Sequence, residues 1–426
     1  MTKGLLTLYF ISALLGVLTG AVASLFQSAI SQVDALLVSF FNFVSQNGWP
    51  VALCSALVSM VMVFLAWLAV YYIARESSGS GVPEIEGALL HKRPVFWKRL
   101  LPVKFFAGIL SLSAKMVMGR EGPTIQIGGN LGKMFADLFH LSVHRGDTLI
   151  AAGSAAGLAA AFNAPLAGVL FVMEEMRNQF NYSFTNFKMV VICCVMATIT
   201  MQFFMGSGPS IKMEIFDLPS LSSLWLFLLF GIVVGLVGLL FNKTLMAILR
   251  QLDKLTLAYK IVFVLLTGLL VGFLAAYYPG SVGGGYLIIS KALSMSPSMG
   301  VLCILLIVRF ITTMLSYSTG VPGGFFAPML ALGTLLGLAI FNMFSYILGD
   351  LSVQPGMFAI AGMGALFAAC IRSPITGVIL VVEMTQNYSL ILPLMITCIT
   401  STTVVQLARN EPIYTQLLER TLKLAK

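Results

Sequence analysis

Charged side chains are scarce in this sequence. Asp, Glu, Lys and Arg make up 10% of its 426 residues, whereas hydrophobic types make up 58%, and the mean hydropathy is +0.96. This composition excludes an ordinary soluble domain, and apolar runs near the ~20 residues that cross a bilayer recur from end to end. The sequence predicts an all-α, polytopic integral membrane protein with one domain over residues 1–426 and no soluble regulatory domain.

Cysteine and histidine are too few and too scattered for several kinds of chemistry. The six cysteines lie in apolar stretches without a CxxC pair, so neither a disulfide framework nor a metal site is indicated. The three histidines, His91, His140 and His144, lie in polar loops, which leaves Ser80 without a buried base for serine hydrolysis. We therefore expect no enzyme activity, no metal and no cofactor.

The formal net charge of +9 is carried largely by short loops between apolar runs. That placement is typical of topology signals, so we expect no nucleic-acid partner. The first apolar run, residues 4–26, contains Ala21-Val22-Ala23, which resembles a signal-peptide cleavage site. Because apolar segments continue to Leu407, we expect this run to be retained as a membrane segment, with Lys3 inside.

The distribution of Lys and Arg among the loops predicts the topology. Four segments are basic and are expected in the cytoplasm: 91–99, 137–147, 243–260 and the C-terminal tail. Four others carry Lys212 as their single basic residue and are expected outside: 31–48, 206–222, 278–285 and 349–356. By the positive-inside rule, both chain ends then lie in the cytoplasm.

Residues 101–136 lie between two consecutive cytoplasmic segments, so they must enter the membrane and return. Either two tilted helices or one helix followed by a broken one satisfies this topology. The turning point contains Gly119-Arg120-Glu121-Gly122-Pro123, which places a carboxylate between an arginine and a helix-starting Gly-Pro. Non-helical backbone at that depth survives where it is buried in protein or lines a cavity. Glu121 is therefore the first candidate functional residue.

Three Gly and Pro patterns recur along the chain at nearly constant spacing. The pairs are Gly79-Ser80-Gly81 with Gly283-Gly284-Gly285, Pro123 with Pro328, and Pro165 with Pro374, at shifts of 204, 205 and 209 residues. The cytoplasmic segment 137–147 then corresponds to the external segment 349–356. We therefore expect an inverted-topology repeat with broken and tilted helices, its halves near 50–205 and 255–408.

Glycine-proline turns precede three expected helices, at residues 79–83, 119–123 and 320–328. The first turn of a helix presents free N–H groups and the positive end of the helix dipole, which attract anions. Three such ends that converge from two inverted halves would form a cage of donors, to which the Ser80 hydroxyl adds another. A weakly hydrated anion can rest there and still be released.

These motifs resemble the three signature loops of the CLC family of chloride channels and proton-coupled chloride exchangers. The matching segments are Gly79-Ser80-Gly81-Val82-Pro83-Glu84, Gly119-Arg120-Glu121-Gly122-Pro123 and Gly324-Phe325-Phe326-Ala327-Pro328. The similarity extends to Glu411-Pro412-Ile413-Tyr414 and is greatest to the bacterial exchangers. It implies the CLC fold and a homodimer in the cell's inner membrane, with one pathway for chloride and protons per subunit. Since no soluble segment is predicted, we expect no cytoplasmic CBS domains.

The resemblance also implies a central chloride site. The hydroxyls of Ser80 and Tyr414 would face the anion, and the backbone amides of Phe325 and Phe326 would supply the remaining donors. Without the family register, a serine beside glycine is an ordinary turn residue, and a tyrosine near a membrane edge is an ordinary interfacial residue.

Two glutamates receive roles from the same resemblance. Glu121 would be the external gate, whose charged carboxylate occupies an outer anion site formed by the backbone of Arg120, Glu121 and Gly122. Glu175 would be the internal proton acceptor, which separates exchangers from passive channels. Considered alone, Glu121 is a helix-capping acid stabilised by ~0.3–1 kcal/mol, and Glu175 is as readily a solvated helix end as a proton site.

Two alternatives in the same superfamily stay open. A passive chloride channel, gated by voltage or pH, would usually carry a neutral residue at the position of Glu175. A fluoride/proton antiporter would depart at the serine loop and at the gate motif, both of which resemble the chloride type here.

Other charged residues near these motifs have plainer interpretations. Lys115 stands where bacterial exchangers usually have a small residue, and it either acts on the gate or extends its side chain to water. The remaining expectations are that Glu84 and Glu86 face the cytoplasmic loop or pair with Lys92 or Arg93, and that Glu383 is a structural echo of Glu174.

Overall fold

Helices make up most of the computed structural model, which describes residues 2–295, 297–349, 351 and 353–424. In this part of the chain no β-strand is present, and the backbone forms two isolated β-bridges. Eight of the described helices are long and apolar enough to cross a membrane. The predicted all-α, multi-pass membrane architecture is confirmed.

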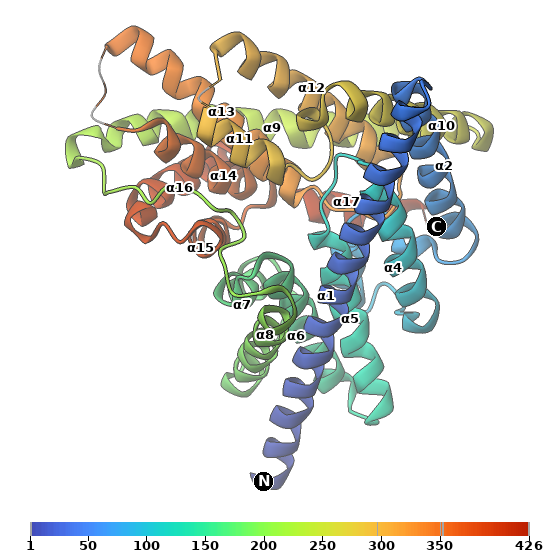
Figure 1. Ribbon diagram of the computed structural model, residues 1–426. Coiled ribbons are helices and arrows are strands. Elements are labelled where there is room, and N and C mark those ends of the chain that lie inside the picture. The colour runs from blue at the N-terminus through green and yellow to red at the C-terminus, as the bar shows by residue number, and fades with distance from the viewer. Residues whose placement is uncertain (1, 296, 350, 352, 425–426) are drawn as a thin grey trace.

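The helices of the two halves of the chain contact one another, as α2 and α10 do at the right of Figure 1. The first half contains α1 (Thr2–Gln46), α2 (Val51–Tyr72), η1 (Arg75–Ser77), α3 (Val82–Leu89), α4 (Trp97–Ser113), α5 (Glu121–Leu138), α6 (Val143–Phe162), α7 (Pro165–Glu174) and α8 (Phe184–Met205). The second half contains η2 (Leu221–Ser223), α9 (Leu224–Asp253), α10 (Leu257–Tyr277), η3 (Pro279–Ser281), α11 (Tyr286–Met295), α12 (Met299–Ser318), α13 (Phe326–Leu348), α14 (Pro355–Ile371), α15 (Pro374–Thr385), η4 (Tyr388–Leu390), α16 (Ile391–Leu407) and α17 (Ile413–Leu424). In Figure 1, α5–α8 lie in the lower part, α11–α16 lie above and to the left, and α17 lies between these groups.

Two predicted loops are wrong because helices continue through them. The external loop expected at 31–48 is mostly helical, since α1 runs without a break to Gln46. The cytoplasmic loop expected at 243–260 shrinks to a few residues between α9 and α10. A transmembrane helix can continue into polar residues beyond the apolar core of the membrane. Because the loops were predicted to begin where the hydropathy falls, the predicted ends of α1 and α9 came too early. The predicted turn within 101–136 is confirmed, because α4 and α5 are joined by a short non-helical segment.

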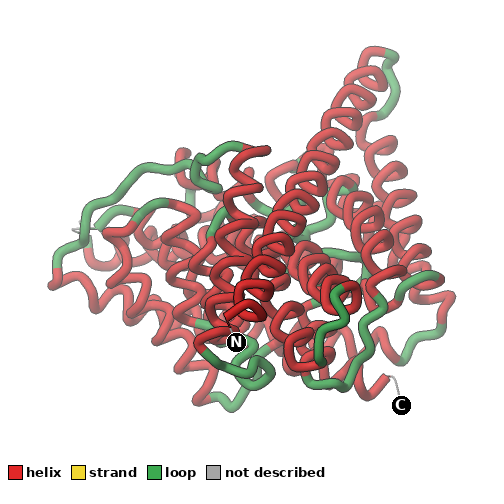
Figure 2. Tube along the Cα trace, turned by 90° about the horizontal axis from the view of Figure 1, so that it is seen from below, coloured by secondary structure: helices red, strands yellow, loops and turns green. Residues whose placement is uncertain are grey.

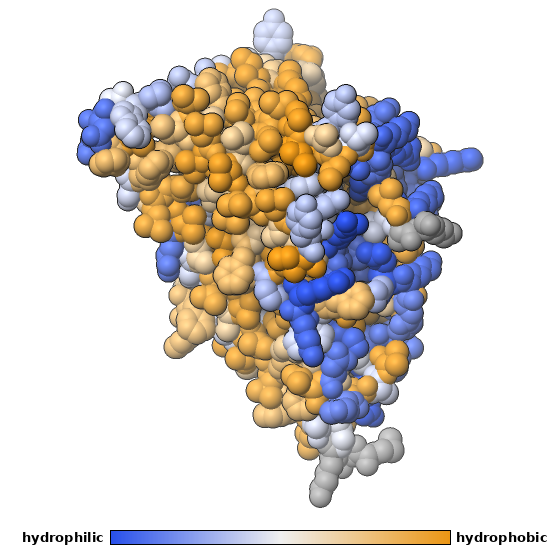
Figure 3. Space-filling model, turned by 90° about the vertical axis from the view of Figure 1, so that its right-hand side faces the viewer, coloured by the Kyte–Doolittle hydropathy of each residue, from blue (hydrophilic) through white to orange (hydrophobic). Residues whose placement is uncertain are grey.

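The chain ends and the apolar surface are consistent with a membrane-embedded body. In Figure 2, α1 starts and α17 ends in the lower part of the molecule, whereas the α1–α2 connection lies at the top. Figure 3 shows hydrophilic residues gathered along one edge and hydrophobic residues over most of the remaining face. Phe203 and Leu407, which are 84% and 78% exposed, illustrate the apolar side chains that a lipid-facing surface presents. That both ends lie on the cytoplasmic side stays a prediction.

Glycines allow matching helix pairs in the two halves to approach closely. A Cβ added at Gly128 of α5 would collide with the carbonyl of Gly153 in α6, and one at Gly333 of α13 would collide with that of Gly362 in α14. These glycines follow Pro123 and Pro328, the second pair of the predicted repeat. The same close packing therefore occurs at equivalent points of both halves.

Glu174, at the end of α7, caps the start of α15, and Glu383, near the end of α15, caps the start of α7. The Glu383 carboxylate accepts hydrogen bonds from the backbone amides of Leu166 and Ala167 at the start of α7, at 3.1 and 2.8 Å. Glu174 accepts bonds from the first turn of α15, including the Thr376 amide at 2.7 Å. Each carboxylate satisfies free N–H groups and meets the positive end of a helix dipole. The predicted echo is confirmed, while the limits of the two repeats, near 50–205 and 255–408, stay a prediction.

Candidate functional site

The three predicted glycine-proline turns meet at the centre of the molecule. Gly79 pairs with Pro322 in one β-bridge, and Gly119 pairs with Gly324 in the other. The second bridge is closed by two bonds, from the Gly119 amide to the Gly324 carbonyl at 2.7 Å and from the Gly324 amide to the Gly119 carbonyl at 2.8 Å. Irregular backbone at this depth is thereby hydrogen-bonded, as a membrane interior requires.

Glycine is necessary where these turns touch one another. A Cβ at Gly122 would lie 2.8 Å from the Cα of Ser80, so the gate motif rests directly on the serine loop. Gly81 has a φ of +81°, and a Cβ there would overlap the side chain of Gln126. A left-handed conformation with no room for a side chain leaves glycine as the residue that fits.

Each turn leads directly into a helix. Helix α3 begins at Val82, α5 at Glu121 and α13 at Phe326, and each has a proline within its first three residues. Proline is well tolerated there because the first amides of a helix have no intrahelical acceptor. The positive ends of three helices therefore lie on turns that contact one another, which is the arrangement that favours an anion.

The candidates for the central site are fully buried and lie together. Ser80, Phe325, Phe326 and Tyr414 are each 0% exposed. The Tyr414 ring stacks on that of Phe325 with centroids 5.2 Å apart and meets that of Phe326 edge-on at 6.0 Å. The Tyr414 hydroxyl lies near Ser80, yet it meets the geometry of a hydrogen bond to no described residue. The Tyr414 hydroxyl is thus a buried donor without an acceptor, close to the Ser80 side chain.

Glu121 is buried at the start of α5, with one bonded and one unbonded oxygen. Its Oε1 accepts a hydrogen bond from the hydroxyl of Tyr286 at 2.8 Å. Its Oε2 has no partner among the described residues and lies against Gly119, where any Cβ would collide with it. The carboxylate therefore sits beside the Gly119–Gly324 bridge, where the start of α13 also reaches it through the backbone of Ala327.

Glu175 lies at the end of α7, and its neighbours differ from the prediction. The Ser373 hydroxyl donates to Glu175 Oε2 at 2.9 Å. Glu86 was expected in the cytoplasmic loop or beside Lys92 or Arg93, but it is 2% exposed and lies next to the Glu175 carboxyl. The short helix α3 turns this residue inward, which the loop pattern did not indicate. The expectation for its neighbour is confirmed, because Glu84 pairs with Arg93 at 2.9 Å.

Lys104 is a buried cation that the sequence analysis missed. It is 0% exposed, and its Nζ donates to the carbonyls of Ser77 at 2.9 Å and Gly79 at 2.7 Å. A buried ammonium is costly unless its protons have acceptors. The acceptors here are the end of η1 and the serine loop that follows it. The sequence did contain an indication of this buried cation, because Lys104 lies among the apolar residues of α4.

Lys115 has a partner other than the gate. Its Nζ lies 2.7 Å from Asp34 Oδ2 of α1, and both side chains are partly exposed. In the described part of the chain no contact joins Lys115 to Glu121, so the structure gives no direct support for an action of Lys115 on the gate.

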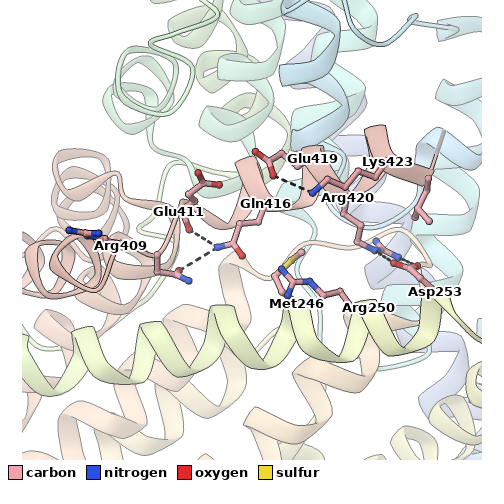
Figure 4. Close-up of a pocket in the computed structure, with 11 residues that line it drawn as sticks. Met246, Arg250, Asp253, Arg409, Glu411, Gln416, Glu419, Arg420 and Lys423 are labelled. Atoms are coloured by element: carbon pink, nitrogen blue, oxygen red, sulfur yellow. Dashed lines mark hydrogen bonds and ion pairs between the residues drawn. The ribbon is translucent and has the colours of Figure 1, made fainter. Parts of the chain in front are cut away.

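Two cavities lie on either side of α17. One of about 480 Å³ is lined by Gly79, Gly81 and Tyr317 and also by charged residues such as Arg93 and Arg420, so it leads to the serine loop. The other, of about 350 Å³, lies between α9 and α17 (Figure 4). Beside it, Arg420 forms two bonds to Asp253, at 2.7 and 2.6 Å. This bridge fixes α17, the helix that carries Tyr414.

Comparison with known proteins identifies the family. A model of the voltage-gated chloride channel family matches residues 62–406. The chain belongs to this family. The similarity to CLC proteins stated from the three motifs is thereby confirmed, and the family is one of transporters and channels.

Curated relatives cover nearly the whole chain. The H(+)/Cl(-) exchange transporter ClcA of Vibrio parahaemolyticus is 46% identical over 422 residues, which are 97% of this chain and 89% of the relative. The protein of the same name from Salmonella typhimurium is 45% identical over 98% of this chain and 89% of its own length.

Solved structures share the fold. The crystal structure of a slow cyanobacterial Cl-/H+ antiporter has a TM-score of 0.94 and 37% identity, and the match covers 98% of both chains. A CLC-type fluoride/proton antiporter has a TM-score of 0.78 at 20% identity over 97% of this chain and 98% of its own, which shows the fold alone. The predicted CLC fold is therefore confirmed.

Proposed function

We propose that this protein is a secondary active transporter that exchanges chloride for protons across the membrane. The observation that carries the proposal is the buried Glu121 carboxylate, placed where the starts of α5 and α13 meet beside the Ser80 loop. A carboxylate in this position competes with an anion for the same donors. Family membership and the activity named for the bacterial relatives support the same function.

Chloride binds at the centre, between Ser80, Tyr414 and the backbone amides of Phe325 and Phe326. A buried donor without an acceptor is costly, and the unbonded Tyr414 hydroxyl is such a donor. An anion beside Ser80 would satisfy it. Chloride arrives from the cavity lined by Gly79 and Gly81, whose arginines attract anions to its mouth.

Glu121 closes the outer side of this pathway. When charged, its carboxylate occupies the outer anion site formed by the backbone of Arg120, Glu121 and Gly122. When it is protonated or displaced by chloride, it leaves the site and lets an anion pass. Because one group either holds a proton or blocks an anion, the two fluxes are coupled at Glu121.

Protons enter from the inner side at Glu175. Its neighbours, the Ser373 hydroxyl and the buried Glu86 carboxyl, provide a short chain of groups that can hold and pass a proton. Water then connects this chain with Glu121. A passive channel would need no such inner carboxyl, so Glu175 favours the exchanger.

Proton uptake by chloride-loaded vesicles tests this function. Purified protein in lipid vesicles at controlled voltage should draw in protons as chloride leaves, in a fixed ratio. Chloride efflux without proton uptake would indicate the passive channel instead. Fluoride efflux coupled to protons, with no response to chloride, would indicate the fluoride antiporter.

Removal of the two central hydroxyls should weaken chloride binding. Tyr414→Phe combined with Ser80→Ala keeps the ring stacked on Phe325 but deletes both donors. A hydrogen bond to a charged group is worth about 1.5–3 kcal/mol, so we expect affinity to fall about tenfold or more. Titration calorimetry measures this change, with the exposed Tyr259→Phe as control. Unaltered affinity would refute these ligands.

We further propose that the protein is a homodimer in the cell's inner membrane, with both ends in the cytoplasm. The basic loops and the apolar surface in Figure 3 support the membrane orientation. The dimer has the support of the family resemblance.

A further inference from the structure

Tyr286 contacts the gate, although no motif of the sequence pointed to it. Its hydroxyl donates to Glu121 Oε1 at 2.8 Å across 165 residues of sequence. Glu121 is the first residue of α5 and Tyr286 is the first residue of α11, so one helix start holds the other. This is the hydrogen bond that another side chain makes to the carboxylate in the described part of the chain, and no group there meets the geometry of a hydrogen bond to the other oxygen.

From this geometry we propose that Tyr286 is a latch that holds the charged gate in its closed position and thereby limits the rate of exchange. The proposal rests on the function proposed above and deepens it, because it names a positioning residue for the same gate.

The position of the Tyr286 side chain is fixed from two sides. The Arg120 guanidinium lies 5.4 Å from the centre of the Tyr286 ring, close enough for a cation–π contact. Behind the tyrosine, the Gly283–Gly285 turn is packed so tightly that a Cβ at Gly285 would lie 2.6 Å from the Cβ of Ala331. Gly285 also has a φ of +105°, which favours glycine.

Arg309 anchors the backbone of the same turn. It is 0% exposed, and its guanidinium donates to the carbonyls of Gly280, Val282 and Gly283 at 3.0, 3.2 and 2.9 Å. No carboxylate pairs with it in the described residues. A buried guanidinium whose two terminal nitrogens donate to backbone carbonyls holds those carbonyls in place. The hydroxyl of Tyr286 is therefore presented to Glu121 by a rigid support.

The strength of the latch depends on the charge of the gate. A hydrogen bond to an ionised group is roughly twice as strong as one between neutral groups. Tyr286 therefore stabilises the charged carboxylate in place more than the protonated carboxyl. The other charged or titratable groups around the carboxyl, in the part of the chain described, are Arg120 beside it and Arg309 behind the Gly283–Gly285 turn; α13 presents the backbone of Ala327.

Tyr286→Phe tests the latch, since it removes the hydroxyl and keeps the ring under Arg120. We expect chloride turnover in vesicles to rise about three- to tenfold at neutral pH. Without the donor, the gate takes up its proton more readily, so the pH of half-maximal turnover should move upward. The ratio of chloride to protons should stay unchanged. Tyr278→Phe, in an exposed neighbour that makes no such contact, should alter neither rate nor profile.

A second background separates a latch from a general effect on structure. In Glu121→Gln protein, addition of Tyr286→Phe should leave the pH dependence of chloride flux unchanged, because no charged gate remains to be held. An unchanged rate and pH profile in the single variant, or a slower rate, would overturn the latch while chloride–proton exchange by the unaltered protein persists. If the unaltered protein itself moves no chloride, the proposed function fails instead.

Discussion

Replacement of Glu121 by glutamine is expected to abolish proton transport while chloride movement continues. Glutamine has the shape of the gate and can still accept the bond from Tyr286, but it cannot bind or release a proton at the pH of the experiment. In the mechanism that we propose, coupling requires the same side chain to alternate between a charged form that blocks the anion site and a neutral form that carries a proton. Proton flux should therefore fall to that of protein-free vesicles, and the remaining chloride flux should lose its dependence on pH.

Simultaneous recording of both ions in one vesicle preparation measures this outcome. Glu214→Gln is the matched control, because it makes the same chemical change at an exposed residue of a loop that is not one of the turns forming the site. That variant should exchange chloride for protons at the unaltered ratio. Continued uphill proton movement by Glu121→Gln protein would mean that another group carries the proton through the outer half of the pathway.

The outer part of the site could be predicted from sequence because its chemistry is local. Gly, Pro and the functional residue are adjacent in each turn, so the segments around Ser80, Glu121 and Phe326 indicate helix starts without any tertiary information. The convergence of these turns followed from the repeat. The structure then supplied the contacts, including the Gly119–Gly324 bridge and the close fit of Gly122 on Ser80.

The supporting residues could not be predicted, because their partners are distant in sequence. Tyr286 meets Glu121 across 165 residues, and Lys104 meets carbonyls on a different element. The prediction for Glu86 was wrong because this residue lies in the short helix α3. Successive residues of a helix point in different directions, so a carboxyl in α3 faces either the loop or the protein interior according to its position. Tyr414 was predicted from the family resemblance, because the residues around it in the sequence do not indicate that it stacks on Phe325.

The ends of some helices were also predicted wrongly, because they depend on contacts with residues distant in sequence. The α9 helix continues to Asp253 beyond its apolar stretch, and there Asp253 bonds Arg420 of α17. Tertiary contacts of this kind favour helix where hydropathy indicates a loop. The loop boundaries drawn from charge therefore gave the correct order of segments but not their lengths.

Glu175→Gln is expected to abolish proton flux and to retain chloride movement. The carboxyl lies at the end of α7, accepts a hydrogen bond from the Ser373 hydroxyl and has Glu86 beside it, and we propose it as the inner group that receives a proton. Glutamine can keep the bond from Ser373, which preserves the local structure. Since Glu121 stays intact, the gate can still be displaced by chloride. Proton flux should fall to the background of protein-free vesicles, whereas chloride flux should stay within about tenfold of the unaltered protein.

Glu174→Gln provides a control one residue away. Glu174 caps the start of α15, so loss of its charge should lower stability by about 0.3–1 kcal/mol, seen as earlier thermal unfolding, without loss of proton coupling. The two variants thus separate a structural carboxylate from a proton-carrying one at neighbouring positions. Equal loss of coupling in both would indicate that the α7–α15 contact, rather than the Glu175 proton, matters. Coupling that survives in Glu175→Gln protein but is lost in Glu86→Gln protein would transfer the inner role to Glu86, the buried neighbour that shares its surroundings.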